Sequence, residues 1–386
     1  MPQSTSSPRK ILPPIPRRFW RNLVVFIPSL SLTVGFMSDF GAGLAIARET
    51  QSRVSVEVAQ QSNSTEQQAT RAAAEQALQE GLQLFQQQTA ESLRQAIGKS
   101  EEALTLYRAV GDKSMEATTL LIIGRVYSAL GEKQKALDYY NQSLPLSRAV
   151  GDKAVEAITL DNIGAVYSAL GEKQKALDYH NQALPLFHAL GSKKDEAITL
   201  GNIGAAYSGL GEKQKALDYY NQSLTLFREV GDKAGEATTL DNIGVTYSDL
   251  GEKQKALDYH NQALPLFRAL GNKRGEAITL GNIGAAYSDL GEKEKALDYY
   301  NQSLPLSRAV GDKVGEAATL YNIASLERDR GNLNEALTQI NAAIEIIENL
   351  SAKIDSQQLR ASYLASVQNY YQFKTDLMRQ LHKSTS

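Results

Sequence analysis

The sequence predicts an all-α protein, an α-solenoid in which antiparallel helix pairs stack one on the next. A short motif, Gly-Glu-Lys, recurs every 40 residues, at Gly131, Gly171, Gly211, Gly251 and Gly291. A second motif, Ala-Leu-Asp-Tyr, recurs in step with the first. Each period also contains two segments whose apolar residues have helical spacing. A fixed period of about 20 to 50 residues is typical of repeat architectures, in which each unit packs on its neighbours.

Alternate repeats are more alike than adjacent ones. Residues 161–200 and 241–280 are identical at 33 of 40 positions, whereas 161–200 and 201–240 are identical at 27. We therefore infer that a pair of repeats, 80 residues long, was the duplicated unit.

The first 47 residues differ from the repeats and predict a signal peptide or an N-terminal membrane anchor. Basic residues precede an apolar run from Leu23 to Met37, and an Ala-Ile-Ala tripeptide follows at 45–47. A basic region, an apolar region of about 15 residues and an A-x-A site are the parts of a secretory signal. The apolar run is shorter than the roughly 20 residues of a membrane span. We expect that the segment is cleaved and that the protein is exported, so that it is periplasmic, extracellular or membrane-tethered. The alternatives are an uncleaved N-terminal anchor and a cytoplasmic chain.

The rest of the chain divides into four segments. Residues 48–71 are polar, without apolar periodicity, and predict a flexible linker. Residues 72–110 predict a degenerate first repeat, and 111–350 an array of six 40-residue repeats. Residues 351–386 predict one long C-terminal capping helix and a tail. Degenerate end units are expected because a terminal repeat has one uncovered face.

The sequence of each repeat predicts two helices, which we call helix A and helix B in chain order. In one repeat, helix A is expected from about Lys153 to Leu170, with Asp152 as its N-cap. Helix B follows the turn at Gly171. A small residue such as Gly164 on helix A lets the two backbones approach closely. Proline late in most B helices is expected to kink or end them.

These offsets resemble the tetratricopeptide repeat: Leu, then Leu-Gly, Tyr, Ala, an aromatic residue and Ala. The pattern recurs five times in register across residues 114–310. It departs from the family because Leu replaces the usual Trp, as at Leu160, and because the period is 40, as in kinesin-light-chain-like arrays. The resemblance implies a right-handed superhelix whose concave groove, lined by helix A, binds a peptide or protein. The chain also resembles the N-terminal half of bacterial exported proteins in which such repeats precede a CHAT domain, a caspase-like peptidase fold; no catalytic residue is transferred.

A row of asparagines is the main candidate site. At about 100° per residue, Asn162 lies opposite the core position Leu160 on helix A. The row consists of Asn162, Asn202, Asn242, Asn282 and Asn322. Amides can donate to and accept from a peptide backbone, so we expect this row to line the groove. The alternative is that the asparagines are copies of one solvated ancestral residue.

Further groove residues are expected beside the asparagines. They are Asp161, Asp241, Asp249, Asp289, Arg125 and Tyr321. Because most of the acidic residues lie late in the array, we expect the C-terminal half of the groove to be the more acidic. A basic or N-terminal-amine ligand would fit there, although a few carboxylates are also ordinary surface.

Composition and motifs favour no catalytic chemistry. The chain has no cysteine and a net charge of −2, so thiolate sites are excluded and no basic field indicates nucleic acid. His180 and His260 stand where other repeats have tyrosine, and we interpret them as packing residues rather than metal ligands. No phosphate loop, HExxH or nucleophile elbow occurs. We therefore expect no cofactor, no metal and no nucleic-acid partner, and membrane contact only through an uncleaved N-terminal segment.

Two functions remain. The first is a non-enzymatic scaffold or adaptor whose groove binds a peptide or protein partner. The second is a regulatory or substrate-recruiting subunit that acts with a CHAT-type peptidase on another chain.

Overall fold

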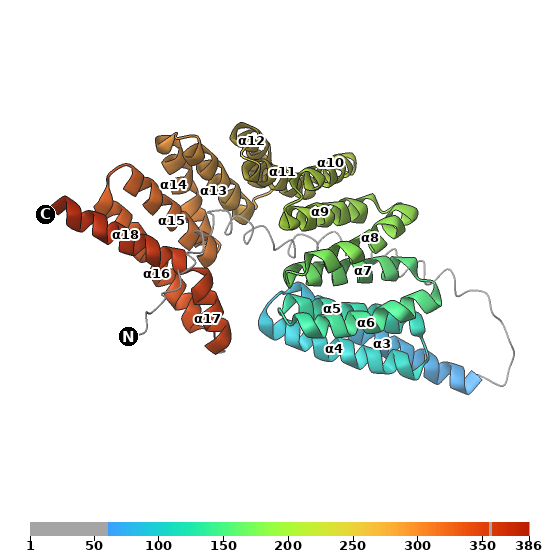
Figure 1. Cartoon of the computed structure of the whole chain (residues 1–386). Helices are drawn as coiled ribbons and strands as arrows, with labels where there is room; N and C mark the ends of the chain where they lie inside the picture. The colour runs from blue at the N-terminus through green and yellow to red at the C-terminus, as the bar shows by residue number, and fades with distance from the viewer. Residues whose placement is uncertain (1–60, 355–356, 386) are drawn as a thin grey trace, which may run out of the picture. The chain divides into compact units, whose positions relative to one another are not determined.

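A computed structural model describes residues 61–354 and 357–385 and confirms the all-α fold. Consecutive helices pair as hairpins, and no strand occurs among the described residues (Figure 1). The helices are α3 (Gln61–Gln86), α4 (Ala90–Ala109), α5 (Lys113–Ala129), α6 (Lys133–Val150), α7 (Lys153–Ala169), α8 (Lys173–Leu190), α9 (Lys193–Leu210), α10 (Lys213–Glu229), α11 (Lys233–Asp249), α12 (Lys253–Ala269), α13 (Lys273–Asp289), α14 (Lys293–Ala309), α15 (Lys313–Asp329), α16 (Leu333–Ala352), α17 (Gln357–Ser366) and α18 (Gln368–Thr385). None of these helices combines the length and the apolar composition that a membrane span requires.

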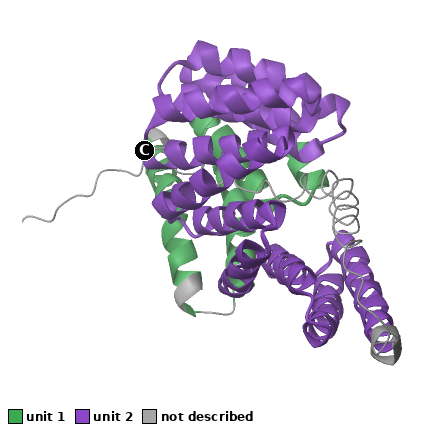
Figure 2. Ribbon diagram, turned by 90° about the vertical axis from the view of Figure 1, so that its right-hand side faces the viewer, with its two compact units in different colours: residues 1–26, 303–386 green, residues 27–302 purple. Residues whose placement is uncertain are grey.

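The chain forms two compact units, coloured separately in Figure 2. The described part of the larger unit is 61–302, and that of the smaller unit begins at 303. In the larger unit the A helices α5, α7, α9 and α11 each pack on the B helix of their own hairpin and on the B helix before it. The A helices α5, α7, α9, α11 and α13 also contact one another in sequence. Equivalent positions of successive A helices therefore lie next to each other.

The hairpins from α5 to α14 close where a glycine of helix A meets a ring of helix B, whereas Ala324 stands at the glycine position in α15. A Cβ atom added at Gly204 would lie 2.8 Å from Cδ1 of Tyr220. In the neighbouring repeat, a Cβ at Gly164 would lie 2.7 Å from Cε1 of His180. Such distances are too short for a real contact, so glycine is required for the helices to approach this closely. The expected role of these small residues is confirmed.

The turns follow one pattern. Gly151 has φ of 74°, a left-handed conformation that suits glycine, and it ends α6. Asp152 then accepts hydrogen bonds from the backbone N–H groups of Ala154 and Val155, at 3.1 and 3.0 Å, and so caps α7 as predicted.

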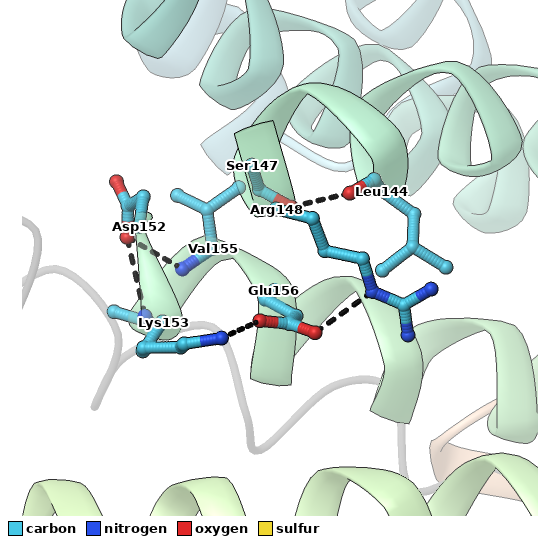
Figure 3. A network of polar contacts seen from close by, with 8 residues as sticks. Leu144, Ser147, Arg148, Asp152, Lys153, Val155 and Glu156 are labelled. Carbon is cyan, nitrogen blue, oxygen red and sulfur yellow. Dashed lines mark hydrogen bonds and ion pairs between the residues drawn. The ribbon is translucent and has the colours of Figure 1, made fainter. Parts of the chain in front are cut away.

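A charged clamp joins each hairpin to the next (Figure 3). Arg148 at the end of α6 and Lys153 at the start of α7 both donate to the buried carboxylate of Glu156, each at 2.8 Å. Burial alone would raise the pKa of Glu156, but the hydrogen bonds from Lys153 and Arg148 outweigh it and leave the pKa below its ordinary value. The equivalent glutamates are Glu116, Glu236, Glu276 and Glu316. One joint differs, since exposed His188 replaces the arginine and contacts Glu196 at 3.0 Å.

The N-terminal boundary differs from the prediction. Residues 61–71 were assigned to the flexible linker, but they belong to α3, which begins at Gln61. Gln and Ala are good helix formers, and Arg71 forms an ion pair with Asp112 that ties this part of α3 to the start of α5. The predicted signal segment 1–47 and the remainder of the linker lie outside the described residues.

Proline does not end the B helices. α6 continues through Pro145 to Val150. Pro145 removes the N–H that would bond the carbonyl of Asn141, but both residues are exposed, so water can satisfy that carbonyl. In α10, Thr225 stands at the same position and its hydroxyl donates to the Asn221 carbonyl at 2.8 Å.

The predicted single C-terminal helix is two helices, α17 and α18, with Val367 between them. Val367, Tyr370 and Leu377 are buried in one cluster with Ile340 and Ile344 of α16. The break allows the apolar side of α18 to pack on α16. This packing stabilises two helices in place of the single continuous helix that the sequence predicted.

We expect Gly204→Ala to destabilise the protein by about 1–3 kcal/mol, because the new methyl group overpacks against the ring of Tyr220. Gly98→Ala is the matched control, since a Cβ at that helical position meets nothing within 4 Å. That substitution should instead stabilise by about 0.5–1 kcal/mol, because glycine is a poor helix residue. Urea unfolding of the three proteins measures both effects. Equal unfolding free energies for the two variants would show that the hairpin contact is not as close as described.

Glu156→Gln should lower the free energy of unfolding by about 1 kcal/mol at pH 7. The effect is this small because water screens the charges of the exposed lysine and arginine. Because folding lowers the pKa of Glu156, the contribution is present above the unfolded value of about 4.3 and is lost as the pH falls through the folded value. The difference between wild type and variant should therefore shrink as the pH is lowered from neutral. A difference that is constant with pH would mean that the clamp is not electrostatic.

Candidate functional site

The predicted asparagine row lies on the A helices and is half-buried throughout. Its members within residues 61–302 stand on α7, α9, α11 and α13, whereas Asn322 is on α15 in the smaller unit. We use the name A-helix face for the surface formed by the asparagines of α7, α9, α11 and α13 and their neighbours on the same helices. The residues directly before the asparagines are 161, 201, 241 and 281, and those one turn before them are 158, 198, 238 and 278. The residues one turn after the asparagines are 165, 205, 245 and 285.

The asparagines differ in their hydrogen bonds. Asn162 donates to the carbonyl of Ile158 in its own helix at 2.9 Å. Asn282 donates to Oδ2 of Asp241 on the preceding A helix at 3.1 Å. The side chains of the other three have no hydrogen-bond partner within the part of the chain that the structure describes: Asn202, Asn242 and Asn322. A half-buried amide with unused donors and acceptor is suited to a ligand.

Asp161 belongs to a buried polar cluster. His180 is fully buried, and its Nδ1 lies 2.7 Å from Oδ1 of Asp161. Thr199 on the next A helix donates to the same oxygen at 3.1 Å. The Nε2 atom of His180 has no partner within the described part of the chain and packs beside Gly164.

A second cluster lies 80 residues later. The Nδ1 of His260 is 2.7 Å from Oδ1 of Asp241, and Asn282 occupies the other carboxylate oxygen. Here the threonine equivalent to Thr199, Thr279, has a buried hydroxyl without a hydrogen-bond partner in the described structure. The same aspartate is thus satisfied in one copy by threonine and in the other by asparagine.

The expected ligand-facing carboxylates at the ends of the A helices are instead counter-ions. Asp249 is buried, and its Oδ2 lies 2.8 Å from Nζ of Lys213. Asp289 is 32% exposed in its side chain and pairs with Lys253 at 2.6 Å. The expectation of an acidic C-terminal half rests on Asp249 and Asp289, and both charges are paired with lysines at the preceding turns.

Earlier in the array, alanine and glycine stand at 169 and 209, the positions equivalent to Asp249 and Asp289. Lys133 and Lys173 donate to the carbonyls of Ser128 and Ser168, and burial lowers the pKa of both lysines. The acidic residues at 249 and 289 thus compensate a cation that recurs two residues after Gly131, Gly171, Gly211, Gly251 and Gly291.

The two remaining predicted residues lie at the ends of the array. The guanidinium of Arg125 stands 5.8 Å from the ring centre of Phe85, and burial lowers its pKa, partly offset by the charge of Asp195. Tyr321 packs against Tyr370 of α18, with ring centres 4.7 Å apart. It therefore contributes to the core of the smaller unit, which corrects its assignment to the groove.

The aspartate–histidine pairs were the feature that sequence reasoning missed. Their signal was present: Asp occurs with His at 161 and 180 and at 241 and 260, whereas Gly occurs with Tyr at 201 and 220 and at 281 and 300. Within residues 61–354 and 357–385, no three His, Cys, Asp or Glu side chains come together in a way that could hold a metal ion. The chemistry that the face offers is hydrogen bonding and apolar contact.

Comparison with known proteins agrees with this architecture. The tetratricopeptide repeat family matches residues 87–149, 156–229, 195–269 and 275–349, more than half of the chain. The fold is similar to that of the apo form of RapI, with a TM-score of 0.58 and 18% identity over 72% of this chain and 99% of the other. It is similar to the apo quorum sensor NprR from B. thuringiensis, with a TM-score of 0.56 and 18% identity over 81% and 99%.

A Rap protein complexed with competence and sporulation factor has a TM-score of 0.53 and 16% identity over 83% of this chain and 95% of the other. No curated protein gives a significant match. At these identities the solved structures show the fold alone. The repeat pattern, the stacked hairpins and the family match agree, and the chain belongs to the tetratricopeptide repeat family.

Proposed function

We propose that the protein is a non-catalytic interaction scaffold whose A-helix face binds an extended peptide segment of a partner protein. The observation that carries this proposal is the pair of half-buried, unbonded amides of Asn202 and Asn242 on consecutive A helices. Each amide offers donors and an acceptor, which are the groups that a peptide backbone needs when it leaves water.

The spacing of the row suits an extended chain. Packed helices lie about 8–10 Å apart, and a strand rises about 3.3 Å per residue. One repeat therefore corresponds to about three residues of ligand. A peptide of roughly nine to twelve residues would cover the asparagines from α7 to α13.

The residues beside the row support close approach. The positions one turn after the asparagines carry small side chains on three of the four helices, Ala165, Ala205 and Ala285. Among the similar structures, a Rap protein forms a complex with competence and sporulation factor, which supports a partner-binding role for this fold. A CHAT-type peptidase on another chain, implied by the sequence resemblance, is one such partner, and its co-purification from the host would identify it.

Replacing Asn202 and Asn242 together by Ala should weaken partner binding while leaving the fold intact. Two hydrogen bonds at about 1 kcal/mol each correspond to a loss of roughly thirtyfold in affinity. The measurement is the Kd of the wild type and the variant for a partner captured from the host, with thermal unfolding as the check on folding.

The matched control is Asn181 and Asn221 to Ala. These asparagines are exposed on the B helices α8 and α10, so the residue type is the same and only the surface differs. Loss of binding in this control, with full binding by the A-helix variant, would place the working surface on the B helices and contradict the proposal.

A further inference from the structure

We infer that the A-helix face from α7 to α13 selects an uncharged peptide segment, with small or aliphatic side chains, rather than a basic one. This inference rests on the proposed function and specifies its ligand. It follows from the way in which each carboxylate on or beside this face is already occupied.

The two aspartates within the row form hydrogen bonds with other side chains of the protein. Asp161 lies against His180 and Thr199, at 2.7 and 3.1 Å, and its side chain is 16% exposed. Asp241 lies against His260 and accepts from Asn282, and its side chain is 9% exposed. Both contacts of Asp161 use Oδ1, so a cation that approached Oδ1 of Asp161 or either oxygen of Asp241 would compete with the groups already bound there. Displacing the aspartate would leave a buried histidine without its partner, which is costly.

The two aspartates at the ends of the A helices are paired with lysine. Asp249 is almost fully buried beside Lys213, and Asp289 pairs with Lys253. The second oxygen of Asp249 has no hydrogen-bond partner among the described residues, but it is inaccessible to solvent and thus to a ligand. A cationic ligand would compete here with a lysine that is already in place.

What remains on the face is neutral. Isoleucines stand one turn before the asparagines at Ile158, Ile198 and Ile278, each half-buried, with the unbonded amides of Asn202 and Asn242 beside them. A charged ligand side chain would lose water here without gaining a counter-charge, whereas an aliphatic one would gain by burial.

The test uses three pools of random dodecapeptides with acetylated and amidated ends, which removes the terminal charges. The first pool contains Ala, Ser, Thr, Val and Gln; the second adds Lys, and the third adds Glu. Immobilised full-length protein is incubated with each pool, and the bound peptides are identified by mass spectrometry. We expect enrichment of uncharged sequences from all three pools, with affinities that change by less than about twofold between low and high salt.

A designed charge makes the test specific to this face. Thr238 is exposed on α11 one turn before Asn242, and the equivalent residues of the neighbouring A helices are Ile198 and Ile278, so Thr238→Glu places a new carboxylate on the A-helix face without disturbing the core. Lysine-containing peptides should then bind about two- to fivefold more tightly, and this gain should be lost at high salt. Gln182→Glu is the control, because it adds the same charge on the exposed side of α8 and should change nothing.

The outcomes separate the inference from the proposed function. Preferential enrichment of Lys- or Glu-containing peptides by the wild type, abolished by the Asn202 and Asn242 variant, would overturn the inference and leave the function standing. No enrichment from any pool, or enrichment that this variant does not reduce, would contradict the proposed function as well. Uncharged peptides that depend on the two asparagines support both.

Discussion

The contact on which the rest of the structure depends is the one between the glycine of an A helix and the ring of its B helix, which recurs in the hairpins from α5 to α14. Gly204 and Tyr220 meet in this way, as do Gly164 and His180. Because no Cβ separates them, the two helices approach closely and the hairpin becomes a unit of fixed geometry. Glycine turns and the arginine–glutamate–lysine clamps then repeat that unit, so equivalent residues of successive A helices become neighbours.

The identity of that ring has consequences on the A-helix face. Where the ring is His180 or His260, a buried imidazole nitrogen needs a partner, and an aspartate from helix A supplies it. The aspartate in turn accepts from the following A helix, through Thr199 in one copy and Asn282 in the other. Where the ring is Tyr220 or Tyr300, glycine stands in place of the aspartate. The same histidine–aspartate pair thus leaves Asn202 unbonded in one copy and engages Asn282 in the other.

Local pattern was enough to predict the hairpins and the cap at Asp152. Periodicity and turn chemistry determine these features within one repeat. The environment of the carboxylates was not predictable in the same way, because Asp161 and His180 lie on different helices and Asp241 and Asn282 on different hairpins. The break at Val367 has no glycine or proline to mark it, since it follows from packing on α16. An acidic residue in a repeat is thus as readily a counter-ion as a ligand contact.

The central claim is that the side-chain amides of Asn202 and Asn242 bind the backbone of an extended peptide. It is tested most directly by NMR of the protein labelled with ¹⁵N-asparagine, titrated with an enriched uncharged dodecapeptide. The account predicts that the side-chain resonances of Asn202 and Asn242 shift with the peptide and exchange more slowly with water. Those of the exposed B-helix residues Asn181 and Asn221 should stay unchanged. Shifts confined to the B-helix asparagines would contradict it.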